Sequence, residues 1–385
     1  MAKTWLLNGN IVTPMGIIHG HLAIESGKCS DIVSEEMFVA FQLGPEDTRY
    51  DVSGCDVFPS LVDLHHDAYE KAWNPRVGVH VPLTLALETV DKQAAMNGFG
   101  TIFHAVTCSG QTPVRSLSAV TELLDELSKW RDSGKGLVNH FVHLRWEIPY
   151  EEATPMVMKW LTEGGIDLLS VMDHSPGQGK MLSKDRHDYY LAKLGGETIS
   201  SVATVEFAQK TRSEQSLRAI LQAARIMGIP VAAHDVVTPS EVEHWNAQGV
   251  VGCEFPLQLD TARVAKAKDM SVIVGAPNVL RGESHEKWLS AREAILAGAV
   301  DVLVSDYYPP ATLPAIYTLV DLGLPLQEAV DLCTTGPMKM IESGTYRSSL
   351  RYGEAADIVV VHKQAGDWPV VKQLWHNGDL VMSRL

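Results

Sequence analysis

The chain has no long apolar run, no closely paired cysteines and no excess of positive charge. No apolar stretch is long enough to span a membrane, and the first residues lack the apolar segment of a signal peptide, so we expect a cytoplasmic protein. The five cysteines are scattered without a CxxC motif, which predicts reduced, mostly buried thiols. The net charge of −15 argues against nucleic acid and anionic membranes as partners.

At 385 residues the chain can form a barrel and an accessory domain. Its 45% hydrophobic and 21% charged residues are ordinary for a globular protein. We expect a small-molecule substrate, and an anionic one would need positive charge gathered locally by metal ions or by clustered Arg and Lys. Whether the chain forms a homo-oligomer is left open by the sequence.

The two ends of the chain share a pattern of short apolar runs separated by turn residues. Residues 1–56 and 345–385 therefore predict one small β-sandwich domain built from both termini. Within the first segment, Asn8-Gly9-Asn10 between two apolar runs predicts a hairpin turn.

Residues 57–344 alternate between apolar strand-like runs and helical patterns, which predicts an α/β fold with a TIM-like (β/α)8 barrel. Gly228, Gly298 and Gly336 follow three of the helical patterns and predict helix ends. A long polar stretch at 175–215 predicts a lid beside the site. The expected strands are Val57–His65, Thr101–Val106, Phe141–Ile148, Asp167–His174, Pro230–Asp235, Gly252–Leu257, Ser271–Asn278 and Asp301–Tyr307.

The first of these strands ends in His65-His66-Asp67. Residues two apart on a strand share a face, so His65 and Asp67 point the same way. In a parallel barrel the carboxyl ends of the strands carry the chemistry. An imidazole and a carboxylate side by side at such an end can hold a divalent metal ion, although an ordinary hydrogen-bonded pair has the same pattern.

Metal-ligating residue types recur at the ends of the later strands, and this recurrence predicts a metal centre. An isolated buried histidine is usually structural, but a run of such residues at carboxyl ends is not well explained that way. The residues concerned are Glu147, Asp173, His174, His234, Asp235, Glu254 and Asp306. The ligand types suit zinc, manganese or iron, and their number fits two divalent ions.

Two such ions sharing a hydroxide would supply a nucleophile at neutral pH. A carboxylate such as Glu147 can bridge the ions. Asp306 is then expected to act catalytically, passing the proton of the water to the leaving group. A plain ligand role for Asp306 fits the same pattern.

These residues, in this order, resemble the amidohydrolase superfamily, and more closely its PhnM-like branch, the diphosphatases of phosphonate metabolism. The resemblance spans nearly the whole chain, including Met172-Asp-His-Ser-Pro-Gly-Gln178, Gly275-Ala-Pro-Asn278 and Ser305-Asp-Tyr-Tyr-Pro309. It implies hydrolysis of alpha-D-ribose 1-methylphosphonate 5-triphosphate to the 5-phosphate and pyrophosphate. The implied metal ligands are His65, Asp67, Glu147, His174, His234 and Asp306, with Glu254 as a further candidate.

Basic residues near the same strand ends are the candidates for substrate binding. Arg suits bidentate phosphate contacts and Lys acts as a point charge. These candidates are Lys71, Arg76, Arg145, Lys180, Arg281 and His285. Glu283 and Glu286 depart from the branch pattern, so the same centre in a paralogue acting on an amide, cyclic amide, lactone or amino-heterocycle is the alternative. A barrel that has lost catalysis is the third reading, and the complete ligand set argues against it.

Overall fold

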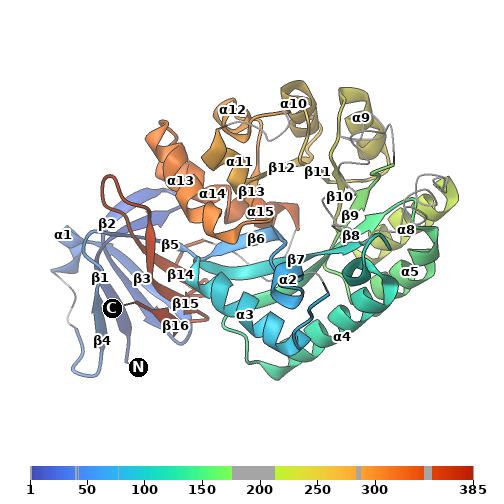
Figure 1. Cartoon of the computed structure of the whole chain (residues 1–385). Coiled ribbons are helices and arrows are strands. Elements are labelled where there is room, and N and C mark those ends of the chain that lie inside the picture. The colour runs from blue at the N-terminus through green and yellow to red at the C-terminus, as the bar shows by residue number, and fades with distance from the viewer. Residues whose placement is uncertain are drawn as a thin grey trace.

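Two eight-stranded sheets organise the protein, which is described by a computed structural model (Figure 1). The structure describes residues 2–39, 41, 43–76, 78–175, 213–282, 288–341 and 349–384. Most of the predicted lid at 175–215, together with Lys180, His285, Glu283 and Glu286, lies outside these residues. No helix in the described ranges is long and apolar enough to cross a membrane.

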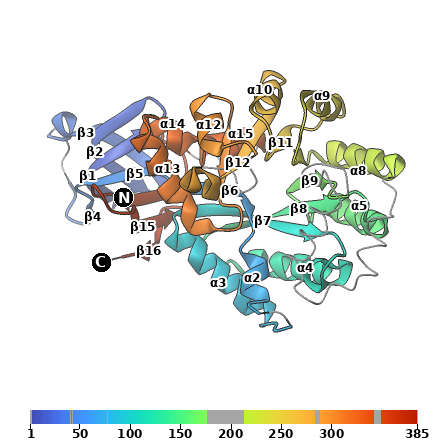
Figure 2. The same cartoon turned by 45° about the horizontal axis from the view of Figure 1, so that its top comes forward.

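The first sheet, sheet A, is mixed and is built from both ends of the chain, as predicted. Its order is β16-β15-β14-β5-β1-β2-β3, with β4 pairing with β1. Both termini lie on this side of the molecule (Figure 2). Its strands are β1 (Thr4–Thr13), β2 (Gly16–Glu25), β3 (Lys28–Ser34), β4 (Thr48–Asp51), β5 (Cys55–Pro59), β14 (Ile358–His362), β15 (Val370–His376) and β16 (Asp379–Ser383).

The predicted hairpin at Asn8-Gly9-Asn10 is wrong, because β1 continues through it. The strand absorbs these residues as an irregularity, with a register shift between Leu6 and Gly9 and a φ of 65° at Asn8. A side chain at Gly9 would approach Val57 Cγ2 to 2.9 Å, so the glycine allows β1 to lie close to β5.

The second sheet, sheet B, is the predicted barrel, with parallel strands in the order β13-β12-β11-β10-β9-β8-β7-β6. All eight predicted strands are present, but the run Val57–His65 is divided between the sheets, so that β5 belongs to sheet A and β6 to the barrel. The barrel strands are β6 (Leu61–His66), β7 (Phe99–Cys108), β8 (Asn139–Glu147), β9 (Leu168–Met172), β10 (Val231–His234), β11 (Gly252–Glu254), β12 (Ser271–Gly275) and β13 (Val302–Val304).

Helices surround the barrel strands in both views (Figures 1 and 2). Gly228 caps α8 in the left-handed conformation, as predicted. Gly336 does not end a helix: it lies inside α15, and an added Cβ would come within 2.0 Å of Asp301 O. The α-helices are α1 (Glu35–Phe38), α2 (Tyr69–Trp73), α3 (Leu83–Met96), α4 (Leu117–Ser133), α5 (Thr154–Glu163), α8 (Glu214–Met227), α9 (Pro239–Ala247), α10 (Leu259–Ala267), α11 (Ala276–Arg281), α12 (Ala291–Leu296), α13 (Thr312–Asp321), α14 (Leu326–Asp331) and α15 (Thr335–Met340).

A continuous apolar core joins the barrel to sheet A. Val12 and Phe58 from the first strands, and Val359 and Leu374 from the last, belong to the same buried cluster as the helices and strands of the barrel. A separate cluster, which includes Leu64 and Phe103, fills the barrel interior. This interior packing supports the floor of the site at the carboxyl ends of the strands.

Candidate metal centre

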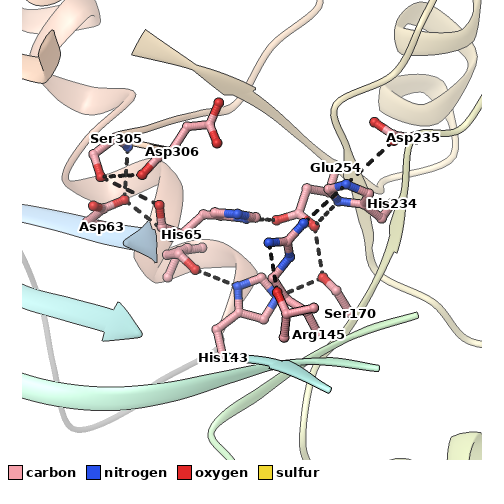
Figure 3. Close-up of polar contacts among 12 residues, drawn as sticks. Asp63, His65, His143, Arg145, Ser170, His234, Asp235, Glu254, Ser305 and Asp306 are labelled. Atoms are coloured by element: carbon pink, nitrogen blue, oxygen red, sulfur yellow. Dashed lines mark hydrogen bonds and ion pairs between the residues drawn. The ribbon is translucent and has the colours of Figure 1, made fainter. Parts of the chain in front are cut away.

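Two groups of metal-ligating side chains meet at the carboxyl ends of the barrel strands. The first group, the His143 group, consists of His65, His143 and Glu254, and the second, the Asp235 group, consists of His174, His234 and Asp235. Within each group the ligand atoms lie within 4.8 Å of one another. Figure 3 shows most of these side chains converging from separate strands.

Glu254, at the end of β11, links the two groups. Its Oε1 lies 2.6 Å from His65 Nδ1, and its Oε2 lies 2.7 Å from His234 Nδ1. Ser170 Oγ also donates to Glu254 Oε2 at 3.0 Å and lies 2.7 Å from His143 Nε2. One fully buried carboxylate therefore fixes the orientation of a histidine from each group.

The Asp235 group is held by a second buried carboxylate, Glu147. Glu147 Oε1 forms a short contact with His174 Nδ1, and its Oε2 accepts from the His174 amide at 3.2 Å. The other ring nitrogen of His174 lies 3.4 Å from Asp235 Oδ2, and His234 Nε2 lies 3.6 Å from the same oxygen. Glu147 thus orients the His174 ring through its Nδ1, while Asp235 lies beside the Nε2 atoms of His174 and His234.

Burial sets the ionisation of the histidines. Burial lowers the pKa of His143 to about 3 and that of His234 to about 4. Burial alone would raise the pKa of Glu254, but the neighbouring His65 and His143 hold it well below its ordinary value. At neutral pH His143 and His234 are therefore neutral and Glu254 is ionised, the protonation states in which these groups ligate metals.

Three non-glycine residues next to the site adopt left-handed backbone conformations. The φ angles of Asp235, Phe255 and Asp306 are 54°, 53° and 55°. Such a conformation at a non-glycine residue costs on the order of 1 kcal/mol and is concentrated at functional sites. At Asp235 it brings the carboxylate to the same side as the preceding His234, where a regular strand would separate the two.

The remaining predicted ligands lie near the two groups but belong to neither. Asp67 Oδ1 is buried without a hydrogen-bond partner among the described residues. Burial and the neighbouring Glu70 raise the pKa of Asp67 to about 6. Asp306 lines the same cavity as His234 and Asp235. Ligand roles for Asp67, Glu147 and Asp306 remain predictions.

The donor set fits divalent metal ions. Histidine nitrogens and carboxylate oxygens of the two groups converge in a buried site, and the unpaired Asp67 oxygen is a further donor without a partner in the described chain. Each group could hold one ion, and Asp67 could supply an additional oxygen.

A cavity of about 260 Å³ opens beside the Asp235 group. Two predicted substrate-binding residues, Arg145 and Arg281, line it, whereas Lys71 and Arg76 are exposed and are not among its lining residues. Arg145 also contacts the site directly, with its Nη2 3.4 Å from His234 Nε2. The remaining lining includes Phe255, Leu257, Asn278, Trp288 and Tyr307.

His143 was not among the predicted metal-ligating residues, and Asp235 was named among the metal-ligating types at strand ends but not in the implied ligand set. His143 is two residues before Arg145 and four before Glu147 on β8, so strand alternation places it on the inward face and could have identified it. Asp235 follows His234 directly, and alternation would have pointed its side chain away from the site.

This fold and donor set define a hydrolase of the amidohydrolase family, and the comparisons with known proteins agree. The sequence model of the Amidohydrolase family matches residues 57–381, so the chain belongs to this family. The chain is 28% identical over 385 residues to the alpha-D-ribose 1-methylphosphonate 5-triphosphate diphosphatase of Escherichia coli K12, covering 97% of this chain and 99% of that protein.

Solved structures show the same fold at low sequence identity. Molinate hydrolase superposes with a TM-score of 0.67 at 14% identity, covering 98% of this chain and 94% of that one. The N-acetylglucosamine-6-phosphate deacetylase of Pasteurella multocida has a TM-score of 0.65 at 13% identity, covering 99% of this chain and 100% of that one. These similarities establish the architecture.

Proposed function

We propose that this protein is a metal-dependent diphosphatase that cleaves a sugar 5-triphosphate, of the type alpha-D-ribose 1-methylphosphonate 5-triphosphate, into the 5-phosphate and pyrophosphate. The observation that carries the proposal is the 28% identity to such a diphosphatase over 97% of the chain. The buried imidazoles and carboxylates beside a cavity with two arginines support it. Cytoplasmic location remains part of the proposal.

Two divalent ions are the proposed cofactors, held by the His143 group and the Asp235 group with help from Asp67, Glu147 and Asp306. Ions bound there would lower the pKa of a water molecule and polarise the phosphorus–oxygen bond. The protein contributes neutral histidines, because burial depresses the pKa values of His143 and His234 to about 3 and about 4. Zinc, manganese and iron all suit these ligands.

Asp306 is the proposed catalytic residue. It lines the cavity beside Asp235 and His234, where it can take a proton from water and deliver it to the leaving group. Arg145 and Arg281 line the same cavity and would neutralise a polyphosphate. Lys71 and Arg76, which follow β6, would extend the positive charge toward the outer phosphates.

The test is pyrophosphate release from alpha-D-ribose 1-methylphosphonate 5-triphosphate by protein loaded with zinc, manganese or iron. We expect turnover that disappears on chelation and returns with metal, and a metal content of about two ions per chain. Asp306→Asn should fold and bind metal but lose most turnover. A metal-replete protein that releases no pyrophosphate would overturn the diphosphatase proposal.

The alternative is a paralogous amidohydrolase acting on an amide, cyclic amide, lactone or amino-heterocycle. The apolar part of the cavity, with Phe255, Leu257 and Trp288, is the observation in its favour, because a polyphosphate needs no such surface. Hydrolysis of these neutral substrates by protein that leaves the triphosphate intact would establish it.

A further inference from the structure

The first and last barrel strands meet at a seam that lacks a continuous ladder. The strand order runs from β13 to β6, and these two ends share an isolated bridge between His66 and Asp306. Deeper in the seam, Val62 N donates to Cys333 O at 2.8 Å, and Leu303 N donates to Leu332 O at 2.8 Å. Leu332 and Cys333, just before α15, therefore accept hydrogen bonds from amides that a β6–β13 ladder would otherwise pair.

The carboxylate of Asp63 spans this seam (Figure 3). Its Oδ1 accepts from the amide of His65 on β6 at 3.2 Å and from the amide of Ser305 after β13 at 3.0 Å. Its Oδ2 lies 2.7 Å from His66 Nδ1. Asp63, His65, His66 and Ser305 are all buried.

We propose that Asp63 is the positioning residue of the metal centre, holding the two closing strands in register so that His65, Asp67 and Asp306 reach the site together. Of its three partners, one is His65 itself, and the other two, His66 and Ser305, are immediate chain neighbours of Asp67 and Asp306. Its hydrogen bonds fix the backbone of His65 directly and that of Asp306 through Ser305. The inference rests on the proposed metal centre and is independent of the substrate.

A nucleophilic role for this cluster is excluded by its geometry. Asp63, His66 and Ser305 are the residue types of a catalytic triad, but Ser305 Oγ and Asp63 approach the same ring nitrogen of His66. A triad requires the serine and the acid at opposite nitrogens. All three residues are also buried, and none of them lines the cavity beside the Asp235 group.

The same molecule provides a matched control for Asp63. Asp91 on α3 is also buried, accepts from the amides of Leu137 and Val138 at 2.9 Å and 3.2 Å, and lies 3.0 Å from His140 Nε2. Each aspartate thus satisfies two backbone amides and one imidazole. Asp91 has no hydrogen bond to a neighbour of the metal centre among the described residues.

The experiment compares Asp63→Ala with Asp91→Ala by zinc affinity, melting temperature and, where turnover is measurable, the separate values of kcat and KM. We expect comparable losses of melting temperature in both variants. Zinc affinity should fall by about 10- to 100-fold in Asp63→Ala, the range found when groups supporting ligands are removed. In Asp91→Ala it should stay within about two-fold of wild type, and Asp63→Asn, which keeps an oxygen for both amides, should restore most of the loss.

Wild-type zinc affinity in Asp63→Ala would overturn the proposal. An equal loss of zinc affinity in Asp63→Ala and Asp91→Ala would overturn it as well. If Asp63→Ala does not fold, amide hydrogen exchange of the wild-type protein tests whether Asp63 holds the Ser305 amide. The Ser305 amide must then exchange as slowly as amides in the barrel ladders, and exchange as fast as in an exposed loop would overturn the assignment. Because zinc affinity and exchange need no substrate, a failed diphosphatase assay leaves this test intact.

Discussion

His143 is the residue through which the proposed metal centre can be tested most directly. Its Nδ1 lies 2.8 Å from Leu64 O, so its Nε2 is the nitrogen left to face Ser170, Glu254 and a metal. His143→Asn should lower metal affinity by more than about 10-fold, because it removes a nitrogen from the His143 group. Equilibrium dialysis with zinc measures this.

The control is His140→Asn on the same strand. His140 is also buried and hydrogen-bonded, but its partners are Asp91 and His104, away from the site. Metal affinity should be unchanged in this variant although some stability is lost. Unchanged affinity in His143→Asn would remove His143 from the centre.

The depressed pKa values predict how the metal-free protein responds to pH. His143 and His234 have pKa values of about 3 and about 4 in the folded protein, below the ordinary 6.5. Below pH 6.5 the unfolded chain therefore binds more protons, and each histidine removes up to about 1.4 kcal/mol of stability per pH unit. Asp67, with its pKa raised to about 6, acts in the opposite direction below pH 6.

The net expectation is that stability falls as the pH drops from 6.5 toward 4, since two histidines outweigh one aspartate. Denaturant unfolding of chelator-treated protein at several pH values measures the slope. His143→Asn should lower that slope by up to about 1.4 kcal/mol per pH unit, the contribution of one proton. A wild-type stability that is flat over this range would contradict the lowered pKa values of His143 and His234.

Strand alternation explains which single residues the sequence could reveal. His65 was expected at the site because it ends an apolar strand, and the structure places it in the His143 group. The same alternation, counted back from Glu147, places His143 on the inward face of β8. The rule fails at Asp235, where a φ of 54° reverses the direction of the side chain. Backbone reversals of this kind at non-glycine residues have no signal in a single sequence.

Among the elements, the junction of β12 and α11 controls the position of Asp306. A Cβ added to Gly275 would lie 3.2 Å from Asp306 Oδ2 and 3.4 Å from Asp306 Cβ. Gly275→Ala should therefore push the carboxylate by a few tenths of an ångström and lower turnover several-fold, because catalysis is sensitive to small displacements. Steady-state kinetics together with melting temperature separate this from unfolding.

Gly165→Ala is the matched control, because its added Cβ would meet only Trp160 atoms at ordinary distances of 3.6 Å and more. It should leave turnover unchanged. Full activity in Gly275→Ala would show that Asp306 tolerates displacement, and its proposed proton transfer would then lose support.

The elements themselves were largely predictable, because buried parallel strands form apolar runs and helices show a regular apolar spacing. The errors occur where tertiary contacts override local signals. The sequence predicts Gly336 as a helix end. Glycine is instead required there because an added Cβ would lie 2.0 Å from Asp301 O. Asn8-Gly9 looked like a turn but allows close packing of β1 on Val57.

At the scale of the molecule, the pairing of the two chain ends was predictable in kind but not in detail. Short strands at both ends indicated one sheet, and sheet A contains them. The division of Val57–His65 between the two sheets was not visible, because both halves are buried and both begin with apolar residues. Only the strand partners, β14 on one side and β7 on the other, distinguish them.

The shared core predicts that sheet A and the barrel unfold together, although chains of this length often unfold in steps. The hydrogen bond from Tyr317 Oη on α13 to Asp56 Oδ2 on β5, 2.7 Å long, joins the two parts. Tyr317→Phe removes that partly buried hydrogen bond and should cost about 1 kcal/mol. Urea unfolding followed by circular dichroism and by tryptophan fluorescence should give one coincident transition, shifted to lower urea with an unchanged slope.

Tyr352→Phe, at a side chain that is 82% exposed, should cause no shift. Two separate transitions, with only one moved by Tyr317→Phe, would show that the terminal sheet folds independently of the barrel.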